Sequence, residues 1–553
     1  MKYKIIITEI LVIGAGGAGL RAAIEAKKKG TNVYLLGKEV LGCAHTGMAM
    51  GGMNAAMVKP ATSQFHAHIT MEGGYFINNE KLVKVFTDEM PDRVYDLEKY
   101  GVIFDRLDNG DFYTWAGPKQ KYPLNVCIGD YTGREMMQAM VDEARKLKIK
   151  YSDEFFVSKL LKKNDIVIGA FGVNLKTGEF VLFQAKAVIL ATGGAGRMYE
   201  VTTNAASNTG DGYAMALDVG AELVDMEMIQ FHPTGMNYPP SVRGVLVTEK
   251  TRAHGGILRN RKGERFMKKY YPKEMELAKR DEVSRSIFQE VAAGFGTKNN
   301  SVYLHVDHWP KEKILEIIPD VYEQYKNTGI DISKEPMEVY PSMHHVMGGI
   351  KIDEWGKTNI PGLFAAGEVT GGIHGANHLG GNSIAEGQVF GRRAGIMANK
   401  FSRESKIQKP NEKEINEEIK KIKRFLKNDK GIAPHSIENK LKKTMWNNVG
   451  IFKNEKTLRK AKKEVEKLII ESKKMRARTK IKERNRDLQD CLEIMNMLNT
   501  AQAVIEAGLM RKESRGAHSR TDFPETKQEW KKNIIVLKSS GKIATKIVPV
   551  VTL

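Results

Sequence analysis

A glycine-rich turn between an apolar strand and a helix, near the start of the chain, constrains the fold most. Residues 10–19 read ILVIGAGGAG, an apolar run followed by Gly14, Gly16 and Gly19. In such a turn the first glycine permits a tight bend, the second lets the backbone approach a pyrophosphate, and the third lets helix and strand pack closely. The start of the following helix stabilises phosphate charge. The pattern therefore predicts an α/β domain that binds a dinucleotide.

The first nineteen residues superficially resemble a secretory leader. Glu9 interrupts their apolar run, however, and the run continues directly into the glycine turn. We therefore expect a first β-strand and a cytoplasmic protein. No run of about eighteen apolar residues occurs, so no transmembrane helix is expected.

Two further segments indicate that the dinucleotide is FAD rather than NAD. The second predicted strand, Val33–Leu36, is followed by Lys38, where an NAD site normally has an acidic residue for the ribose. The runs 187–194 (AVILATGG) and 358–368 (TNIPGLFAAGE) are both apolar strands that end in glycine turns. Three such elements in this order resemble the two-dinucleotide class of flavoproteins.

The chain is too long for one compact core, because single cores stop growing at roughly 250–300 residues. We predict a Rossmann-like α/β FAD-binding domain in two pieces, with an inserted α+β capping domain and a C-terminal helical domain. In the helical part, apolar residues recur at helical spacing from Leu458 to Ile469 and predict a packing face. The predicted boundaries are 1–230 and 342–404 for the FAD-binding domain, 231–341 for the cap, 405–510 for the helices and 511–553 for a C-terminal segment.

Cysteine content and charge limit the other functions. Cys43, Cys127 and Cys491 are far apart and form no CxxC pair, so we expect no metal site and no iron–sulfur cluster within this chain. The net charge of +21 comes largely from lysines interspersed with glutamates, which is typical of solvated helix faces. The lysine runs lack interleaved aromatic residues, so a nucleic-acid-binding flavoprotein is a disfavoured alternative.

Ten motifs in order give the chain a family resemblance. They are AHTGMAMGG, ATGGAGR, NTGDGYAMA, FHPTG, TEKTRAHGGIL, RDEVSR, HHVMGGI, GLFAAGE, HGANHLGGNS and RKESRGAH. With them the chain resembles the flavoprotein subunits of succinate dehydrogenase and fumarate reductase, with L-aspartate oxidase as a close relative. The resemblance runs from Gly14 to about Glu525. The length also suits a thiol-linked fumarate reductase like that of methanogens.

The resemblance implies hydride exchange between FAD and a small dicarboxylate, fumarate or succinate. His232 and Thr248 match residues that hold one carboxylate, and His344 matches one that holds the other. Arg280 matches the proton donor to the substrate carbon. Glu249 and Arg252 match the relay that returns a proton to it.

The resemblance also implies the residues that contact FAD. His45 matches the position that carries covalent FAD in the family, but the residue alone does not establish the link. The expected cofactor-binding residues are Gly14, Ala15, Gly16, Gly17, Ala18, Gly19, Lys38, Ala44, His45, Thr46, Gly51, Gly52, Asp211, Glu368, Ser383 and Ile384.

The chain departs from the family pattern at three places, all near the expected substrate. His378 replaces the arginine of HGANRLG that clamps the second carboxylate, and it must be protonated to neutralise one. The family's phenylalanine turn is replaced by residues 114–118 (TWAGP), so the aromatic wall is either missing or moved to Trp115. Met50 stands where relatives often carry Glu or Gln. Either the site accepts fumarate with altered clamps, or the enzyme is fumarate-reductase-like and acts on another, larger anion. The type of reaction is therefore better defined than the substrate.

Two other expectations follow. L-aspartate oxidase is the nearest enzymatic alternative, and the RKESRGAH run from Arg511 to His518 favours the dehydrogenase group over it. Passing single electrons onward requires a partner, and the resemblance implies an iron–sulfur electron-transfer subunit. Through such partners the chain would lie at the inner face of a membrane without spanning it.

Overall fold

The computed structural model describes residues 2–118, 120–427, 430–539 and 541–553. Its largest sheet has the strand order β6-β2-β1-β9-β8-β7, with β16 paired to β9. Strands β6, β2, β1, β9 and β16 run parallel to one another, as the glycine turn predicts. Strands β7 and β8 form a hairpin, and β8 pairs antiparallel with β9. The strands are β1 (Lys4–Ile13), β2 (Val33–Leu36), β6 (Lys150–Ser152), β7 (Phe155–Lys163), β8 (Ile166–Asn174), β9 (Phe180–Leu190) and β16 (Leu363–Ala365).

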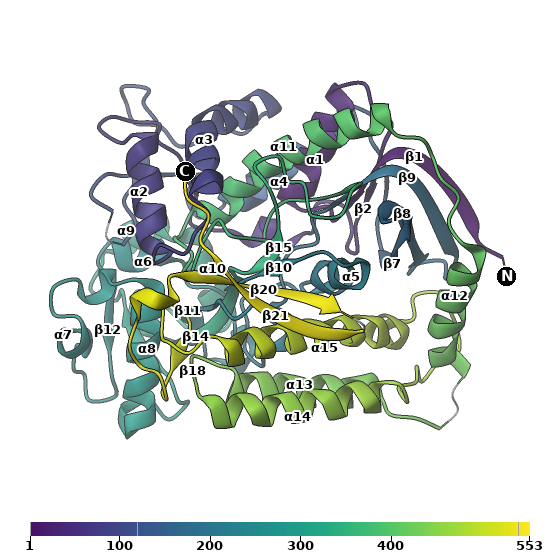
Figure 1. Cartoon of the computed structure of the whole chain (residues 1–553). Helices are drawn as coiled ribbons and strands as arrows, with labels where there is room; N and C mark the ends of the chain where they lie inside the picture. Colours follow the sequence, from purple (N-terminus) through teal and green to yellow (C-terminus); the bar gives the residue numbers. More distant parts are fainter. Residues whose placement is uncertain (1, 119, 428–429, 540) are drawn as a thin grey trace.

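Helices α1 (Gly17–Lys28) and α11 (Asn382–Glu404) pack on this sheet and on each other (Figure 1). Small residues allow the close approach of these two helices: a Cβ on Gly391 would lie 2.6 Å from the Ala18 carbonyl oxygen. Three more helices surround them, namely α2 (Ser63–Gly73), α3 (Glu80–Tyr100) and α4 (Thr132–Lys146). The N-terminal segment with α1 and the later segment with α11, far apart in sequence, thus share one hydrophobic core.

The predicted cap contains a second sheet with its own apolar core. Its order is β11-β14-β13-β12, entirely antiparallel. The strands are β11 (Ile229–Met236), β12 (Ile257–Arg259), β13 (Val302–His305) and β14 (Met337–Val346). The helices are α6 (Glu249–Ala253), α7 (Met267–Tyr270), α8 (Arg280–Glu290), α9 (Lys311–Ile317) and α10 (Pro319–Lys326).

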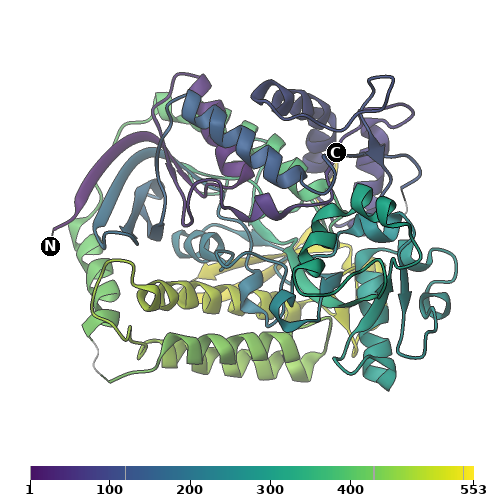
Figure 2. The same cartoon turned by 180° about the vertical axis from the view of Figure 1, so that it is seen from behind.

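Long helices follow α11. They are α12 (Glu412–Lys427), α13 (Pro434–Asn448), α14 (Glu455–Ser472) and α15 (Arg486–Met510). Three of them, α13 to α15, pack side by side in the lower part of the molecule, and α12 lies at one side of it (Figure 2). The predicted apolar face of α14 is confirmed, because Leu458, Ala461, Val465 and Leu468 are buried against neighbouring helices. Helix α15 also packs on α5 (Asp211–Val219), which lines the cofactor region.

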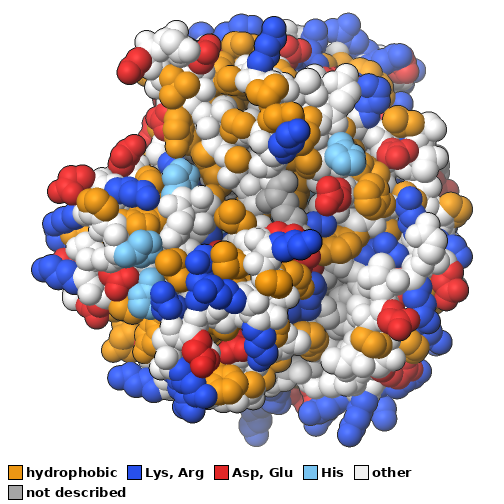
Figure 3. Space-filling model, turned by 90° about the vertical axis from the view of Figure 1, so that its left-hand side faces the viewer, with side chains coloured by type: hydrophobic (Ala, Val, Ile, Leu, Met, Phe, Trp, Pro, Cys, Tyr) orange, Lys and Arg blue, Asp and Glu red, His pale blue; other side chains and the backbone are white. Residues whose placement is uncertain are grey.

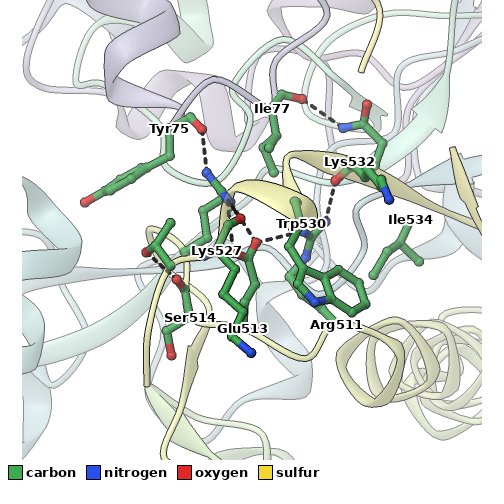
Figure 4. A network of polar contacts seen from close by, with 12 residues as sticks. Tyr75, Ile77, Arg511, Glu513, Ser514, Lys527, Trp530, Lys532 and Ile534 are labelled. Atoms are coloured by element: carbon green, nitrogen blue, oxygen red, sulfur yellow. Dashed lines mark hydrogen bonds and ion pairs between the residues drawn. The ribbon is translucent and has the colours of Figure 1, made fainter. Parts of the chain in front are cut away.

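The C-terminal segment completes a third sheet rather than forming a loose tail. Its hairpin adds to strands from the middle of the chain in the order β17-β15-β10-β20-β21. These strands are β10 (Leu223–Val224), β15 (Gly349–Lys351), β17 (Thr370–Gly371), β20 (Lys532–Ser539) and β21 (Lys542–Pro549). Arg511, fully buried, donates to Glu227 and Asp225 and so ties the segment to the FAD-binding part. It also donates to Glu513 within the segment (Figure 4).

Two small sheets complete the fold. Strands β3 (Met53–Asn54), β4 (Thr114–Trp115) and β5 (Asn125–Val126) form one, and β18 (Phe452–Lys453) with β19 (Ser519–Arg520) forms the other. On the face shown in Figure 3, lysine and arginine side chains are interspersed with acidic and apolar ones. Among the described residues, no helix is long and apolar enough to cross a bilayer. The numbered domain boundaries given above remain a prediction.

Candidate active site

A cavity of about 410 Å³ lies between the FAD-binding part and the cap. Its lining extends from the glycine turn at residues 14–18 to His232, Thr248, Glu249 and Arg280 of the cap. All the residues expected to bind substrate line it, and so does every expected cofactor-binding residue except Gly19. Gly19 and Arg252 lie directly behind the lining, where they support residues that do contribute to it.

The glycine turn has the geometry that its sequence predicts. Gly14 has φ +114°, and a Cβ there would lie 2.0 Å from the Ala191 carbonyl oxygen. A Cβ on Gly19 would lie 1.8 Å from the Gly14 carbonyl oxygen, so the first turn of α1 can rest directly on the strand. The backbone at Ala15 and Gly16 borders the cavity. Side chains at Gly14 and Gly19 would collide with neighbouring backbone. With glycine at both positions the turn can form, and its exposed backbone is a cradle that fits a pyrophosphate.

Lys38 belongs to a buried ion cluster beside this cradle. Its Nζ lies 2.6 Å from Asp211 Oδ2, 3.0 Å from Glu493 Oε1 and 2.6 Å from Thr209 Oγ1. Burial by itself would lower the pKa of Lys38, but the two carboxylates outweigh it and raise the pKa. The lysine therefore keeps its positive charge next to the cavity.

The segment after Lys38 forms a short 3-10 helix, η1 (His45–Met48), along the cavity wall. Thr46 Oγ1 accepts a hydrogen bond from Gly17 N at 3.1 Å, which ties this helix to the glycine turn. Ala205 N donates to His45 Nδ1 at 3.3 Å, and burial lowers the pKa of His45 to about 4. The half-buried His45 ring is therefore neutral, with its second nitrogen uncommitted to a described protein group.

Glu368 and the start of α11 line the cavity between its cofactor and substrate regions. Val346 N donates to Glu368 Oε1 at 3.1 Å, and burial raises the pKa of this carboxyl to about 7. Thr192 Oγ1 is buried in the same wall without a partner among the described residues. An unsatisfied hydroxyl in a cavity wall fits a polar ligand such as FAD. Ser383 and Ile384 of α11 complete this wall.

At the substrate end, Glu249 lies between two arginines. Arg280 forms a two-pronged contact with it, Nε to Oε1 and Nη2 to Oε2, both at 3.2 Å. Arg252 Nη2 donates to Glu249 Oε1 at 3.0 Å. Burial by itself would raise the pKa of Glu249, but both guanidinium groups together lower it. The carboxylate is therefore ionised and orients Arg280 toward the cavity.

His232, Thr248 and His344 come together around this arginine. The His232 and His344 rings lie 5.1 Å apart, and Thr203 Oγ1 lies 2.7 Å from His344 Nδ1. Thr248 caps α6, which places its hydroxyl at the cavity. Burial, with Arg280 nearby, lowers the pKa of both histidines well below the ordinary value. His232 Nε2 has no partner among the described residues, so it is available to a ligand.

His378 also lines the cavity, but in this state both its ring nitrogens face protein groups. Ser383 N donates to Nε2 at 3.1 Å, while Nδ1 lies 3.1 Å from Arg280 Nη1. Burial and the neighbouring histidines hold the pKa of His378 well below its ordinary value. The ring is thus neutral here, whereas neutralising a carboxylate requires the protonated form.

The structure adds residues that the sequence did not single out. Gln230 donates from Nε2 to Asn377 Oδ1 and to the His378 carbonyl, so its Oε1 accepts from Arg280 Nη1 at 3.2 Å. His345 is stacked on His378 with ring centroids 4.5 Å apart. The only sequence signal for Gln230 was its place just before the FHPTG motif. Trp115 and Met50, two of the departures from the family, both lie in the cavity wall.

Comparison with known proteins gives the family. An FAD binding domain model matches residues 9–384, and the model of the fumarate reductase flavoprotein C-terminus matches residues 438–552. One subunit of the fumarate reductase (CoM/CoB) of Methanothermobacter marburgensis is 46% identical, over 97% of this chain and 98% of its own length. The chain belongs to the fumarate reductase and succinate dehydrogenase flavoprotein family.

Other members of the family agree with this assignment. The mitochondrial succinate dehydrogenase flavoprotein subunit of Oryza sativa subsp. japonica is 35% identical, over 98% of this chain and 90% of its own length. The solved E. coli quinol fumarate reductase subunit superposes with a TM-score of 0.94 at 32% identity, covering 100% of this chain and 98% of that one. The expected family, α/β fold and FAD-dependent oxidoreductase class are thereby confirmed.

Proposed function

We propose that this chain is the catalytic subunit of an enzyme that reduces fumarate, or oxidises succinate in the reverse direction. FAD, when bound, supplies or accepts the hydride. The observation that carries the proposal is Arg280, held in two places by Glu249 and directed into the cavity among His232, Thr248 and His344. Similarity to fumarate reductase and succinate dehydrogenase subunits supports the same reaction.

Proton delivery is the role proposed for Arg280. A guanidinium has a pKa above about 12 and is a weak acid. The carbanion that a hydride leaves on a dicarboxylate is far more basic, so a weak acid in contact with it suffices. The fixed charge of Arg280 also stabilises negative charge in a closed site. Glu249 and Arg252 then return a proton to Arg280 along the contacts described above.

Substrate orientation is the role proposed for the four remaining residues. His232 and Thr248 bind one carboxylate, and His344 and His378 bind the other. A neutral imidazole contributes a single N–H donor to such a contact. Closing the cap over this end excludes water, which strengthens every polar contact inside.

Electron exchange with the outside requires a partner in this proposal. Among the described residues, no group of three or more His, Cys, Asp or Glu side chains is arranged to hold a metal, and Cys127 and Cys491 are buried singly. We therefore propose that the partner is an iron–sulfur electron-transfer subunit, acting in the cytoplasm or at the inner face of a membrane. Relatives named as subunits of larger enzymes support this.

The test is an anaerobic assay of the FAD-loaded protein with a reduced viologen dye. Oxidation of the dye that depends on fumarate is the expected result. Aspartate-dependent formation of hydrogen peroxide in air, without fumarate reduction, would instead support the L-aspartate oxidase alternative. Acid precipitation of the same sample shows whether flavin stays with the chain, which tests His45 as the attachment point.

A further inference from the structure

The substrate end of the cavity carries less positive charge than a dicarboxylate requires. Its charged side chains are Arg280 and Glu249, with Arg252 directly behind, and together they carry one net positive charge. The histidines around them are neutral. A dicarboxylate brings two negative charges, and an unbalanced charge in a buried site is strongly disfavoured.

Four neighbouring histidines at this end could hold the missing charge. We call them the histidine cluster: His344, His345, His374 and His378. In each pair of contacting rings the ring centroids lie 4.5–6.4 Å apart. Three of the four are at most 4% exposed, and His344 faces the cavity. Within the described part of the chain, His345 Nε2 and both nitrogens of His374 are buried without a hydrogen-bond partner.

The resting contacts disfavour a charged ring at His378. A protonated ring would direct one N–H at the Ser383 amide, which is itself a donor. Its other N–H would lie 3.1 Å from Arg280 Nη1, a second donor, and only Gln230 Oε1, at 3.4 Å, could accept from it. Besides Arg280, the charged or titratable groups nearest the cluster are Glu368, 3.5 Å from His345 Nδ1, and the histidines His45 and His232. None of them supplies a fixed positive charge.

We propose that binding of a dicarboxylate is coupled to the uptake of one proton by His378 of the histidine cluster. The incoming carboxylate takes over from Ser383 and Arg280 as the partner of His378, so a protonated ring becomes favourable. Stacking of His345 on His378 restricts uptake to one proton, because two charged rings 4.5 Å apart repel each other. The proton comes from solvent, and no bond other than the new N–H is made.

This inference rests on the proposed function, and it predicts a specific pH dependence. By linkage, uptake of one proton weakens binding by close to tenfold for each unit rise in pH. The probe is malonate, a dicarboxylate that lacks the pair of adjacent CH₂ groups needed for oxidation. Its affinity for the oxidised holoenzyme is measured from about pH 7 to 9, above the ordinary titration of histidine. Calorimetry in two buffers of different ionisation enthalpy counts the protons directly.

Two variants and a second ligand assign the proton. His378→Arg supplies a fixed charge, so its malonate affinity should change less than about twofold per pH unit. His308→Arg adds the same charge at an exposed position outside the cavity and should keep the native dependence. The half-amide of malonate carries one negative charge and should bind the native protein without proton uptake.

The outcomes separate the inference from the function on which it rests. Malonate binding to the native holoenzyme without proton uptake overturns the inference alone. Uptake that persists in His378→Arg also overturns it, and points to Glu368 as the group that titrates. Failure of both malonate and succinate to bind an FAD-loaded protein overturns the proposed function, and the inference with it.

Discussion

Arg280 is held by acceptors from two different elements. Glu249 comes from α6 and Gln230 from β11, and His378, from the loop before α11, lies against the same guanidinium. Such a network holds the guanidinium in one orientation, and pre-organised donors cost no reorganisation during reaction. The position of this one side chain therefore depends on the cap and the FAD-binding part being packed together.

Two substitutions test this arrangement. Arg280→Lys removes the two-pronged contact, and Glu249→Gln removes the charge that orients Arg280. Each should lower the rate of fumarate reduction by about 10²–10⁴-fold, the usual contribution of general acid catalysis. FAD content should stay unchanged, because neither residue is among those expected to bind FAD. Arg261→Lys, at an exposed position of the cap, is the matched control. A loss below tenfold in both variants would contradict the proposed roles.

The residues proposed to be catalytic could be chosen from sequence because each lies in a motif of characteristic residues, and their roles remain a prediction. Gln230 could not, because its partners Asn377 and His378 lie about 150 residues away. The neutral state of His378 could not be predicted either, since it depends on complete burial among three other histidines.

At the scale of elements, the turn between β1 and α1 leaves no room for side chains. In Gly19→Ala the new methyl would overlap the Gly14 carbonyl, so helix and strand must separate. We expect a loss of about 1–3 kcal/mol or more in the free energy of unfolding, with loss of FAD. The comparison is Gly30→Ala, beyond the other end of α1. There φ is +85° and no atom lies within 4 Å, so only backbone strain of about 1 kcal/mol is added. Equal FAD content in the two purified variants would contradict the packing role of Gly19.

Strand β18 contains a buried lysine whose charge is unfavourable. Burial, with Arg520 close by, lowers the pKa of Lys453 to about 7, against 10.5 in the unfolded chain. Between these values the unfolded chain binds more protons, so native stability rises with pH from about 7 to 10.5. Lys453→Met should therefore stabilise the fold by on the order of 2–4 kcal/mol at pH 7, and by less at pH 9.5.

Urea unfolding at the two pH values measures this difference. Lys456→Met, at an exposed position three residues beyond β18, should have little effect at either pH. A Lys453→Met protein that is less stable than the native chain at pH 7 would show that the lysine has a favourable structural role.

Local patterns predicted some elements more closely than others. The bounds of Val33–Leu36 are correct, because three of its four residues are buried and apolar and the fourth, Tyr34, is half-buried. The strand predicted at residues 10–13 instead begins at Lys4. Its first residues are partly exposed and are held by pairing with β9, a contact that hydrophobicity alone does not reveal.

At the scale of the whole molecule, Arg511 links parts of the chain that are distant in sequence. It is fully buried, and its carboxylate partners include Asp225 and Glu227. It also donates to the carbonyls of Trp530 and Lys532 (Figure 4). Removing one side of a buried ion network leaves uncompensated charges. Arg511→Met should therefore lower the free energy of unfolding by about 3–5 kcal/mol.

The matched control is Arg459→Met, which breaks an exposed ion pair with Glu455 and should cost less than about 1 kcal/mol. Thermal or urea unfolding of both variants provides the measurement. Similar losses in the two proteins would show that the Arg511 network adds nothing beyond a surface pair.

The role of the C-terminal hairpin could not be predicted. Strand β10 has only two residues, too few for a sequence pattern, and its partner β20 begins at Lys532. The alternation of α and β elements predicted the main sheet, because its central strands β1 and β9 are long and largely apolar. The third sheet depends on pairing over a long sequence separation, for which no local signal exists.

That pairing sets an order of events during synthesis. Strand β10 leaves the ribosome about 300 residues before β20, its neighbour in the sheet. At about 5–20 residues per second, the edge of β10 stays uncovered for roughly 15–60 s. The Asp225 and Glu227 carboxylates likewise lack their partner Arg511 for most of that interval, because Arg511 is synthesised much later. The β10 edge therefore stays exposed in the nascent chain until β20 has emerged, and the third sheet assembles only after that.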